Sequence, residues 1–369
     1  MLEKLNVKVG PQFYRYGTNA IDNIPKLITE YNAKNILILH GTVSWKKAKP
    51  YFNSILNDVG FNLKLEKFGG ECSFVEGQRI LDIIKKNNID FIIGVGGGKL
   101  CDLVLHAAEL ANIPFGVVPT LASNCAPWTP LAVMYKENGL AEGKTFHINR
   151  QAAFLLMDPR IIIDAPIDYF IAGIADTIAK WYESDLILQQ EMCKNEPMLQ
   201  MARYSAKMCK DTLLSVADKA IEDMKNQEIT AEFLIASEII ISIAGLVGGF
   251  GDVYSRNTAA HSIHDAISAY LPEVHKYLHG EKVAYGILYQ LSLEENWSEI
   301  DRLLPFYKSH NLPISLTEMG VYPMDDEKLE KVVDLINGKA KVHLLPIDTS
   351  RERLKEAIIK LENYLKEEE

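Results

Sequence analysis

Three short segments in the second half of the chain carry side chains that commonly bind metal ions. Asp176 lies in IAGIADTIAKWYES, an apolar helical pattern in which a carboxylate is costly to bury without a partner. His261 and His264 lie three residues apart in TAAHSIHDAI, on one helical face, and His279 opens HGEKVAYG. Two neutral imidazoles and a carboxylate suit Zn²⁺ or Fe²⁺ and leave coordination positions open for water or substrate. The alternative is that each is an ordinary hydrogen-bonded core residue.

A glycine-rich loop in the first half has the composition of an anion-binding turn. Residues 91–102 read FIIGVGGGKLCD, an apolar strand pattern followed by Gly96, Gly97, Gly98 and Lys99 and then a helical pattern. Each glycine weakens a regular element by about 0.5–1 kcal/mol relative to alanine, so three in a row indicate a geometric requirement. A pyrophosphate at this turn would meet free N–H groups at the start of the helix. The spacing matches neither G-x-G-x-x-G nor a Walker A loop, and a tight turn without a ligand is the alternative.

A second polar loop follows the next strand pattern. Residues 119–135 read PTLASNCAPWTPLAVMY and include the hydroxyl side chains of Thr120, Ser123 and Thr129. Ligands of open α/β sheets bind at the carboxyl edge, where both loops are expected. The alternative is a capped turn without a ligand. Asp102, four residues after the last glycine of the first loop, is either a partner of the helix dipole or a ligand contact.

The first 160 residues alternate strand and helix patterns. Residues 35–39, 90–95 and 115–118 are short apolar runs rich in Ile and Val, typical of buried strands. Helical patterns over 45–58 and 75–87 lie between them. This alternation predicts a parallel sheet with helices on both faces.

From about residue 165 the apolar spacing becomes helical. The sequence predicts helices over 166–190, 197–225, 229–246, 257–270, 280–296, 298–309, 326–337 and 351–367. The fold class is therefore α/β plus all-α. We predict a dinucleotide-binding α/β domain over residues 1–164 and a helical domain over residues 165–369 that binds metal and substrate.

The composition is that of a compact globular protein. The chain has 369 residues, of which 48% are hydrophobic and 24% charged, which excludes disordered, collagen-like and coiled-coil classes. Its net charge of −10 argues against nucleic acid as a partner. The five cysteines are scattered, as reduced thiols are. The N-terminus has no apolar signal region and apolar stretches end well short of ~20 residues, so we expect a cytoplasmic protein with a small-molecule substrate and no membrane partner.

Together these motifs resemble the metal-dependent, or iron-containing, alcohol dehydrogenase superfamily. The segments GVGGGK with Asp102, PTLAS, GIADTIAKWYE, AAHSIHDAI and HGEKVAYGIL occur in the family's order and approximate spacing over nearly the whole chain. The resemblance implies the dehydroquinate-synthase-like fold, with an N-terminal Rossmann-like parallel sheet and a C-terminal helical domain. It also implies NAD or NADP as cofactor and a homo-oligomer of two to eight subunits.

The metal-binding segments are most similar to the glycerol dehydrogenase and hydroxycarboxylate dehydrogenase branch. Iron-type alcohol dehydrogenases carry a further His four residues after the metal-binding Asp, where this chain has Lys180. The resemblance therefore implies one divalent metal with three protein ligands, Asp176, His261 and His279. That ligand set favours Zn²⁺ over Fe²⁺.

The predicted dinucleotide site comprises Gly41, Gly96, Gly97, Gly98, Lys99, Asp102, Thr120, Ser123, Thr129, Leu131 and Tyr135. By resemblance, the glycines and Lys99 form the pyrophosphate loop, and the last part of the set lines the nicotinamide. NAD-preferring relatives carry Asp at the end of the first strand, where this chain has His40 and Gly41. NADPH is therefore admissible, with Lys46 or Lys47 as a phosphate partner.

The polar loop also contains residues that indicate the class of substrate. Glycerol dehydrogenases carry an Asp where this chain has Cys125, and the C-A-x-W-T-P variant resembles hydroxycarboxylate dehydrogenases, which reduce 2-oxo acids. We predict an NAD(P)-dependent oxidoreductase for a small 2-hydroxy acid, with Cys125 and Trp128 at the substrate and His264 passing a proton to solvent. The alternatives for Trp128 and His264 are plain packing. The alternatives for the whole chain are a glycerol dehydrogenase, a dehydroquinate-synthase-like lyase and a non-catalytic nucleotide-binding protein.

Overall fold

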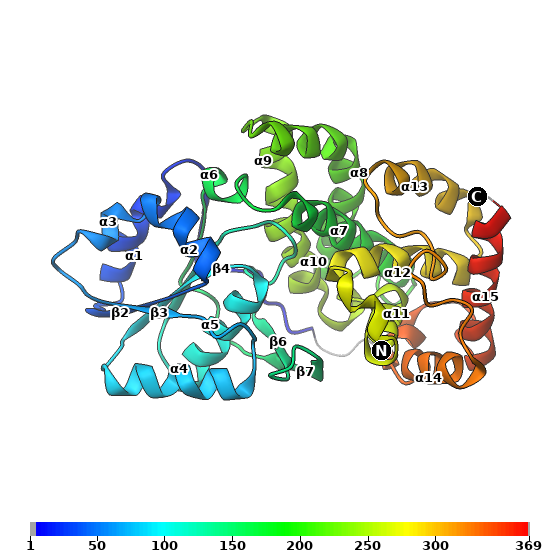
Figure 1. Cartoon of the computed structure of the whole chain (residues 1–369), viewed down its shortest axis with the longest axis horizontal. Coiled ribbons are helices and arrows are strands. Elements are labelled where there is room, and N and C mark those ends of the chain that lie inside the picture. The colour runs from blue at the N-terminus through cyan, green and yellow to red at the C-terminus, as the bar shows by residue number, and fades with distance from the viewer. Residues whose placement is uncertain (1–4, 368–369) are drawn as a thin grey trace. The chain divides into compact units, whose positions relative to one another are not determined.

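The structure is a computed structural model that describes residues 5–367. The chain forms two compact units, each made of more than one segment (Figure 1). One unit contains Lys8–Phe170 and Val216–Gly245 and is called here the sheet unit. The other contains Ile171–Ser215 and Leu246–Glu369, with the first residues of the chain through Val7, and is called the helical unit.

A six-stranded parallel sheet forms the centre of the sheet unit. Its order is β1-β8-β5-β4-β2-β3, and every pair of neighbours is parallel. The strands are β1 (Phe13–Tyr16), β2 (Asn35–His40), β3 (Asn62–Lys67), β4 (Phe91–Gly96), β5 (Phe115–Pro119) and β8 (Phe154–Met157). A separate antiparallel pair is formed by β6 (Leu131–Tyr135) and β7 (Ala141–His147). The predicted strands β2, β4 and β5 are confirmed, as is the parallel sheet.

Helices cover both faces of this sheet (Figure 1). On one face lie α1 (Ile24–Thr29), α2 (Thr42–Ala48) and α3 (Asn53–Leu56), and on the other lie α4 (Phe74–Lys86) and α5 (Gly98–Ala111). All six residues of β4 are buried between them, which is why its sequence FIIGVG contains no charged residue. The single helix predicted over 45–58 is wrong: it is divided into α2, a 3-10 turn that contains Pro50, and α3.

The glycine loop lies at the point where the direction in which the chain adds strands to the sheet reverses. From β2 the chain moves to β3 at one edge of the sheet, and from β4 it moves through β5 to β8 in the opposite direction. The reversal therefore lies between β2 and β4. The carboxyl ends of strands at such a reversal are where open α/β sheets bind their ligands.

The helical unit contains the predicted long helices. They are α7 (Ile167–Leu188), α8 (Pro197–Asn226), α10 (Ala244–Gly251), α11 (Ala259–Tyr270), α12 (His279–Leu293), α13 (Trp297–Ser309), α14 (Asp326–Asn337) and α15 (Arg351–Glu367), of which α7, α8 and α10 also extend into the sheet unit. α11 packs against α12 and α14, and α12 packs against α15 (Figure 1). The predicted helices are confirmed with ends shifted by a few residues, except that the single helix predicted over 229–246 is divided into α9 (Ala231–Glu238), a π-helical segment (Ile239–Ile243) and α10, which ends at Gly251.

One helical segment packs with the sheet rather than with the other helices. Residues 216–245 belong to the sheet unit, so the units differ from the predicted division at residues 164 and 165. Specific contacts explain this: the Gln227 side chain donates to the Ile163 carbonyl at 3.0 Å, and the Tyr14 hydroxyl donates to Glu238 at 2.9 Å. Helical periodicity shows that a segment is a helix but not which unit it joins.

A continuous helical stretch over Ala231–Tyr254 is long and apolar enough to cross a membrane. It has 24 residues and a mean hydropathy of 2.1 in its most apolar window. Within that window 67% of the residues are buried in the protein. The core helices of proteins that span no membrane give the same signature, so the segment is weak evidence for a membrane span.

Candidate functional site

Asp176, His261 and His279 converge in the helical unit. α7 carries Asp176, the first turn of α11 carries His261, and His279 is the first residue of α12. The Asp176 Oδ1 atom lies 3.2 Å from His261 Nε2 and 3.3 Å from His279 Nε2, and one ligand atom from each residue lies within 4.8 Å of the others. Sequence reasoning brought these three residues together correctly.

The arrangement fits a metal ion better than a hydrogen-bonded core. Asp176 Oδ1 is buried and has no well-aligned hydrogen bond to any group of residues 5–367, despite the two imidazole nitrogens beside it. An unsatisfied buried carboxylate oxygen is costly. A cation held between one carboxylate and two imidazoles would satisfy all three atoms at once, and this donor set suits Zn²⁺ or Fe²⁺.

Glu183 was not predicted, and it fixes the orientation of His261. It lies two turns after Asp176 on α7 and is fully buried. Its Oε2 atom lies 2.7 Å from His261 Nδ1, while its Oε1 atom accepts the N–H groups of Thr258 at 2.7 Å and of His261 at 2.9 Å. With Nδ1–H donating to Glu183, the Nε2 lone pair of His261 points toward the cluster. A carboxylate seven residues from a predicted ligand, on the same apolar helix face, was the signal available in the sequence.

The charges of the cluster are strongly coupled. Burial raises the pKa of Asp176, but His261 and His279 outweigh burial and hold that pKa well below its usual range. Burial lowers the pKa of His261, but Glu183 and Asp176 outweigh it and raise that pKa to about 9. His261 is therefore protonated at neutral pH unless a cation takes the place of its proton, so metal binding releases a proton.

His264, predicted to pass a proton, lies beside the cluster. Its ring centre is 4.3 Å from that of His279, and its Nδ1 atom is 3.1 Å from Asp265. Burial, together with His279, lowers the pKa of His264 to about 3. The side chain is neutral at physiological pH, and its role in proton transfer stays a prediction.

Replacing Glu183 with glutamine should weaken metal binding about 10- to 100-fold, the usual effect of losing an outer carboxylate behind a ligating histidine. The amide cannot accept hydrogen bonds from all three N–H groups that now meet the carboxylate. The measurement is a competition titration of the protein with a chelator. Glu299→Gln changes a carboxylate held by Tyr182 and Lys210 instead, and should leave metal affinity unchanged. Equal metal affinity in Glu183→Gln and the wild-type protein would contradict the assignment.

The glycine loop in the sheet unit has the predicted strand–turn–helix form. β4 ends at Gly96, Gly97 caps the helix in an extended conformation, and α5 begins at Gly98. A side chain at Gly98 would come within 3.0 Å of Asn124, so this face of the loop has no room for one. The first N–H groups of α5 have no partner within the helix and are available to an anion. The loop therefore fits a pyrophosphate.

The other predicted nucleotide residues lie along the same edge of the sheet unit. Thr120 follows β5 and donates its N–H to the Gly96 carbonyl, while Leu131 and Tyr135 are the first and last residues of β6. Lys99 forms an ion pair with Glu71 at 2.7 Å and lies 4.6 Å over the Tyr135 ring. Ser123 and Thr129 lie in the intervening loop, and Gly41 caps α2 directly after β2.

Asp102 points into the protein rather than toward the edge of the sheet. It is 5% exposed, its Oδ2 atom accepts the Val133 N–H at 3.0 Å, and its Oδ1 atom has no hydrogen-bond partner within residues 5–367. Burial raises its pKa to about 7, opposed by the Val133 N–H. This position supports neither of the roles left open by the sequence, a partner of the helix dipole or a ligand contact. Asp102 instead anchors β6 to α5.

Because the Asp102 carboxyl is buried, we expect the free energy of unfolding to depend on pH. Because the folded protein holds a proton on Asp102 up to about pH 7 that the unfolded chain loses near pH 4, its free energy of unfolding should fall as pH rises between these values. Asp102→Asn keeps an acceptor for Val133 and removes the ionisation. Its stability relative to the wild-type protein should rise by about 1.4 kcal/mol per pH unit over this range and stay level above it.

Urea unfolding of both proteins between pH 4.5 and pH 8.5 measures this difference. Asp82→Asn, at an exposed position on α4, is the matched control and should show no such slope. A pH-independent difference between Asp102→Asn and the wild-type protein would show that Asp102 is ionised when folded.

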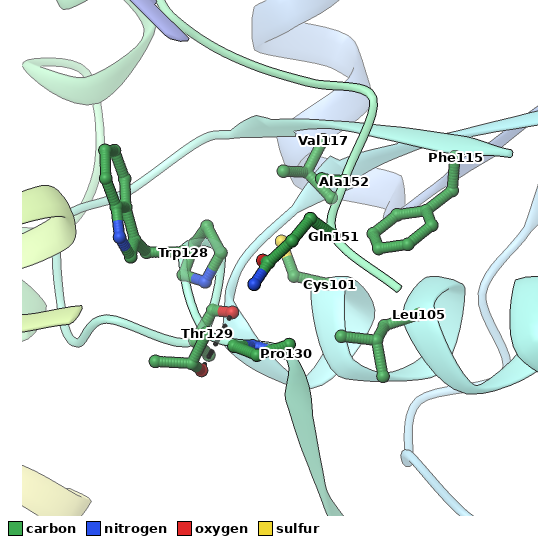
Figure 2. Close-up of a pocket in the computed structure, with 11 residues that line it drawn as sticks. Cys101, Leu105, Phe115, Val117, Trp128, Thr129, Pro130, Gln151 and Ala152 are labelled. Carbon is green, nitrogen blue, oxygen red and sulfur yellow. Dashed lines mark hydrogen bonds between the residues drawn. The ribbon is translucent and has the colours of Figure 1, made fainter. Parts of the chain in front are cut away.

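Trp128 is half-buried and is held within the sheet unit by two contacts. Its Nε1–H donates to the Val9 carbonyl at 2.6 Å, and its ring packs edge-on to Tyr14 at 5.1 Å. It lies at one side of a small cavity, with Phe115 at the other side and Gln151 between them (Figure 2). This cavity has room for about one water molecule, so it does not hold a substrate. Contacts of Trp128 and Cys125 with a substrate stay predictions.

Comparison with known proteins agrees with these observations. The family model described as "Iron-containing alcohol dehydrogenase" matches residues 11–159. The chain is 32% identical over 363 residues to hydroxycarboxylate dehydrogenase A of Escherichia coli strain K12, covering 98% of each chain. It is 30% identical to glycerol dehydrogenase of Thermotoga maritima, covering 89% of each. The crystal structure of glycerol dehydrogenase from Schizosaccharomyces pombe superposes with a TM-score of 0.86 at 28% identity, over 99% of this chain and 92% of that one.

Proposed function

Because the chain belongs to the iron-containing alcohol dehydrogenase family and is an oxidoreductase that acts on alcohol groups, we propose that it interconverts a small 2-hydroxy acid and the corresponding 2-oxo acid. Hydride passes between the substrate carbon and NAD(H) or NADP(H). The fold of the sheet unit and of the helical unit is that of the family. The proposal about the substrate goes beyond the family and is based on the charges in the helical unit.

Two lysines beside the carboxylate–imidazole cluster, Lys180 buried and Lys341 partly buried, carry the proposal. Lys180 lies between Asp176 and Glu183 on α7, is 9% exposed, and has its ammonium 3.4 Å from the Arg256 carbonyl. Lys341 donates to the side chain of the next residue, Asn257, at 2.6 Å, and burial lowers its pKa. The two ammonium groups thus approach neighbouring residues of the turn that leads into α11.

These charges favour an anionic substrate. The three carboxylates of Asp176, Glu183 and Asp265 are balanced by the three ammonium groups of Lys180, Lys341 and Lys339. A divalent cation would then leave the site with an excess of positive charge, and buried charge without a counter-ion is unfavourable. A carboxylate on the substrate supplies that counter-ion, whereas glycerol is neutral. Lys180 is our candidate for the residue that pairs with the substrate carboxylate.

The residues present suit a divalent metal, and we propose Asp176, His261 and His279 as its ligands, with Zn²⁺ favoured over Fe²⁺. A cation bound there supplies Lewis-acid polarisation of the substrate oxygen. Glu183 accepts the Nδ1 proton of His261 and keeps its ring in one orientation. Burial and His279 keep His264 neutral and make it a weak base, and a part for it in passing a proton to solvent stays a prediction. The glycine loop binds the pyrophosphate of the dinucleotide.

A substrate panel tests the proposal. The purified enzyme, loaded with Zn²⁺, should reduce 2-oxobutanoate with NADH or NADPH at a higher kcat/KM than it oxidises glycerol with NAD or NADP. Faster turnover of glycerol would favour the function of the Thermotoga maritima and Schizosaccharomyces pombe relatives instead. From the family resemblance we also propose a cytoplasmic homo-oligomer, which size-exclusion chromatography with light scattering can test for its oligomeric part.

A further inference from the structure

The carboxyl end of β2 lacks the carboxylate that would bind the ribose 2′-hydroxyl of NAD and repel a 2′-phosphate. We propose that the protein prefers NADP(H) over NAD(H), and that His40 and Lys67 hold the adenosine 2′-phosphate. The inference rests on the proposed use of a nicotinamide dinucleotide. It adds which dinucleotide is used and which residues select it.

The sheet order brings this position next to the glycine loop. β2 neighbours β4, which ends in the glycine loop, and β3 neighbours β2 on the outer side. With the pyrophosphate on the loop after β4, an adenosine that extends away from β5 crosses the carboxyl end of β2 and then that of β3. Neighbouring strands are about 4.8 Å apart, so a group on the ribose reaches both strand ends.

The register places His40 and Lys67 side by side. They are paired residues at the ends of β2 and β3, so their side chains leave the same face of the sheet. The His40 ring stacks on Trp45 of α2, with ring centres 4.9 Å apart and 22° between the planes. The backbone at Lys67 is fixed on both sides, because the Phe68 N–H donates to the His40 carbonyl at 2.9 Å and the Arg79 guanidinium donates to the Lys67 carbonyl at 2.8 Å.

Lys67 carries a positive charge that no protein group neutralises. Its side chain is exposed and makes no hydrogen bond or ion pair to any residue from 5 to 367. The neighbouring carboxylate of Glu66 leaves the opposite face of β3 and is bound to Arg79 at 2.7 Å. Lys47, one of the two lysines predicted as phosphate partners, instead forms an ion pair with Asp164 at 2.8 Å. Of Lys47 and Lys67, only Lys67 is free of an ion pair within residues 5–367, and it is the residue paired with His40 in the sheet.

The test measures nucleotide binding by calorimetry, without turnover. The wild-type protein should bind 2′,5′-ADP about tenfold or more tightly than AMP, which differs only in lacking the 2′-phosphate. Lys67→Gln should lose most of that advantage while its affinity for AMP stays the same. Lys64→Gln is the matched control, because Lys64 lies on the opposite face of the same strand and should change neither affinity. His40→Asp should reverse the preference between the two nucleotides.

Equal affinity of the wild-type protein for 2′,5′-ADP and AMP would overturn the inference, as would an equal loss for both nucleotides in Lys67→Gln. Steady-state kcat/KM with NADPH and NADH should follow the same order as the binding constants. An enzyme that binds 2′,5′-ADP as expected but does not turn over 2-oxo acids would contradict the proposed substrate alone. The two proposals therefore fail by different measurements.

Discussion

Replacing Asp176 with asparagine should remove the bound metal and lower kcat/KM for a 2-oxo acid by about 1000-fold or more. The Asp176 Oδ1 atom is close to both His261 Nε2 and His279 Nε2, at 3.2 and 3.3 Å. An amide oxygen has no net charge to offer a cation, and the amide nitrogen would repel it. Metal content per subunit by mass spectrometry and kcat/KM with 2-oxobutanoate are the measurements.

Asp168→Asn is the matched control for this variant. Asp168 lies in the first turn of the same helix and is exposed, so its replacement should change neither metal content nor activity. Because Asp176 is buried, circular dichroism and thermal unfolding of Asp176→Asn must also be recorded. A folded Asp176→Asn protein that keeps its metal and its activity would contradict the proposed metal centre.

Replacing Lys180 with methionine should raise KM for 2-oxobutanoate by about 30- to 100-fold, since charge-assisted hydrogen bonds contribute about 2–3 kcal/mol. Methionine keeps most of the apolar stem of the side chain and removes the ammonium group, with its charge and its contact to the Arg256 carbonyl. A neutral substrate such as acetoin or glycerol should be affected little. The measurement is KM and kcat for both kinds of substrate, because loss of a carboxylate partner changes mainly KM for the acid.

Lys207→Met serves as the control for Lys180→Met, since Lys207 lies on α8 in the same unit and pairs with Asp211 at the surface. Lys207→Met should leave KM and kcat unchanged for both the acid and the neutral substrate. A general loss of metal in Lys180→Met, or an equal fall in activity with the acid and the neutral substrate, would mean that Lys180 stabilises the cluster instead. The proposal of an anionic substrate would then lose its main support.

The elements that the sequence predicts well are those whose apolar pattern is long or fully buried. β4 and the helices of the second half are of this kind, and their positions agree with the structure. Five strands were missed, namely β1, β3, β6, β7 and β8. Several of them are short or mixed in character: β1 reads FYRY, β8 reads FLLM, and β3 alternates apolar and charged residues as NLKLEK. Their pairing partners, distant in the chain, make them strands.

Some residues of the candidate site could be predicted from the sequence, and others could not because their roles depend on contacts between distant residues. Asp176, His261 and His279 could be chosen because their residue types are unusual in apolar helices and resemble a known family. Glu183 ends the segment GIADTIAKWYE but was given no role, because its role depends on the 2.7 Å contact with His261, which the sequence cannot show. The inward position of Asp102 likewise depends on Val133, 31 residues away.

The bonds of Glu183 have a consequence for how the enzyme can be handled. This one side chain joins α7 to both the backbone and the imidazole at the start of α11, so the ligand shell is assembled when the helices pack. Folding therefore prepares the coordination geometry before any ion arrives. Stripping with a chelator should leave an intact apoprotein, and different divalent ions can then be exchanged into one scaffold under native conditions and compared.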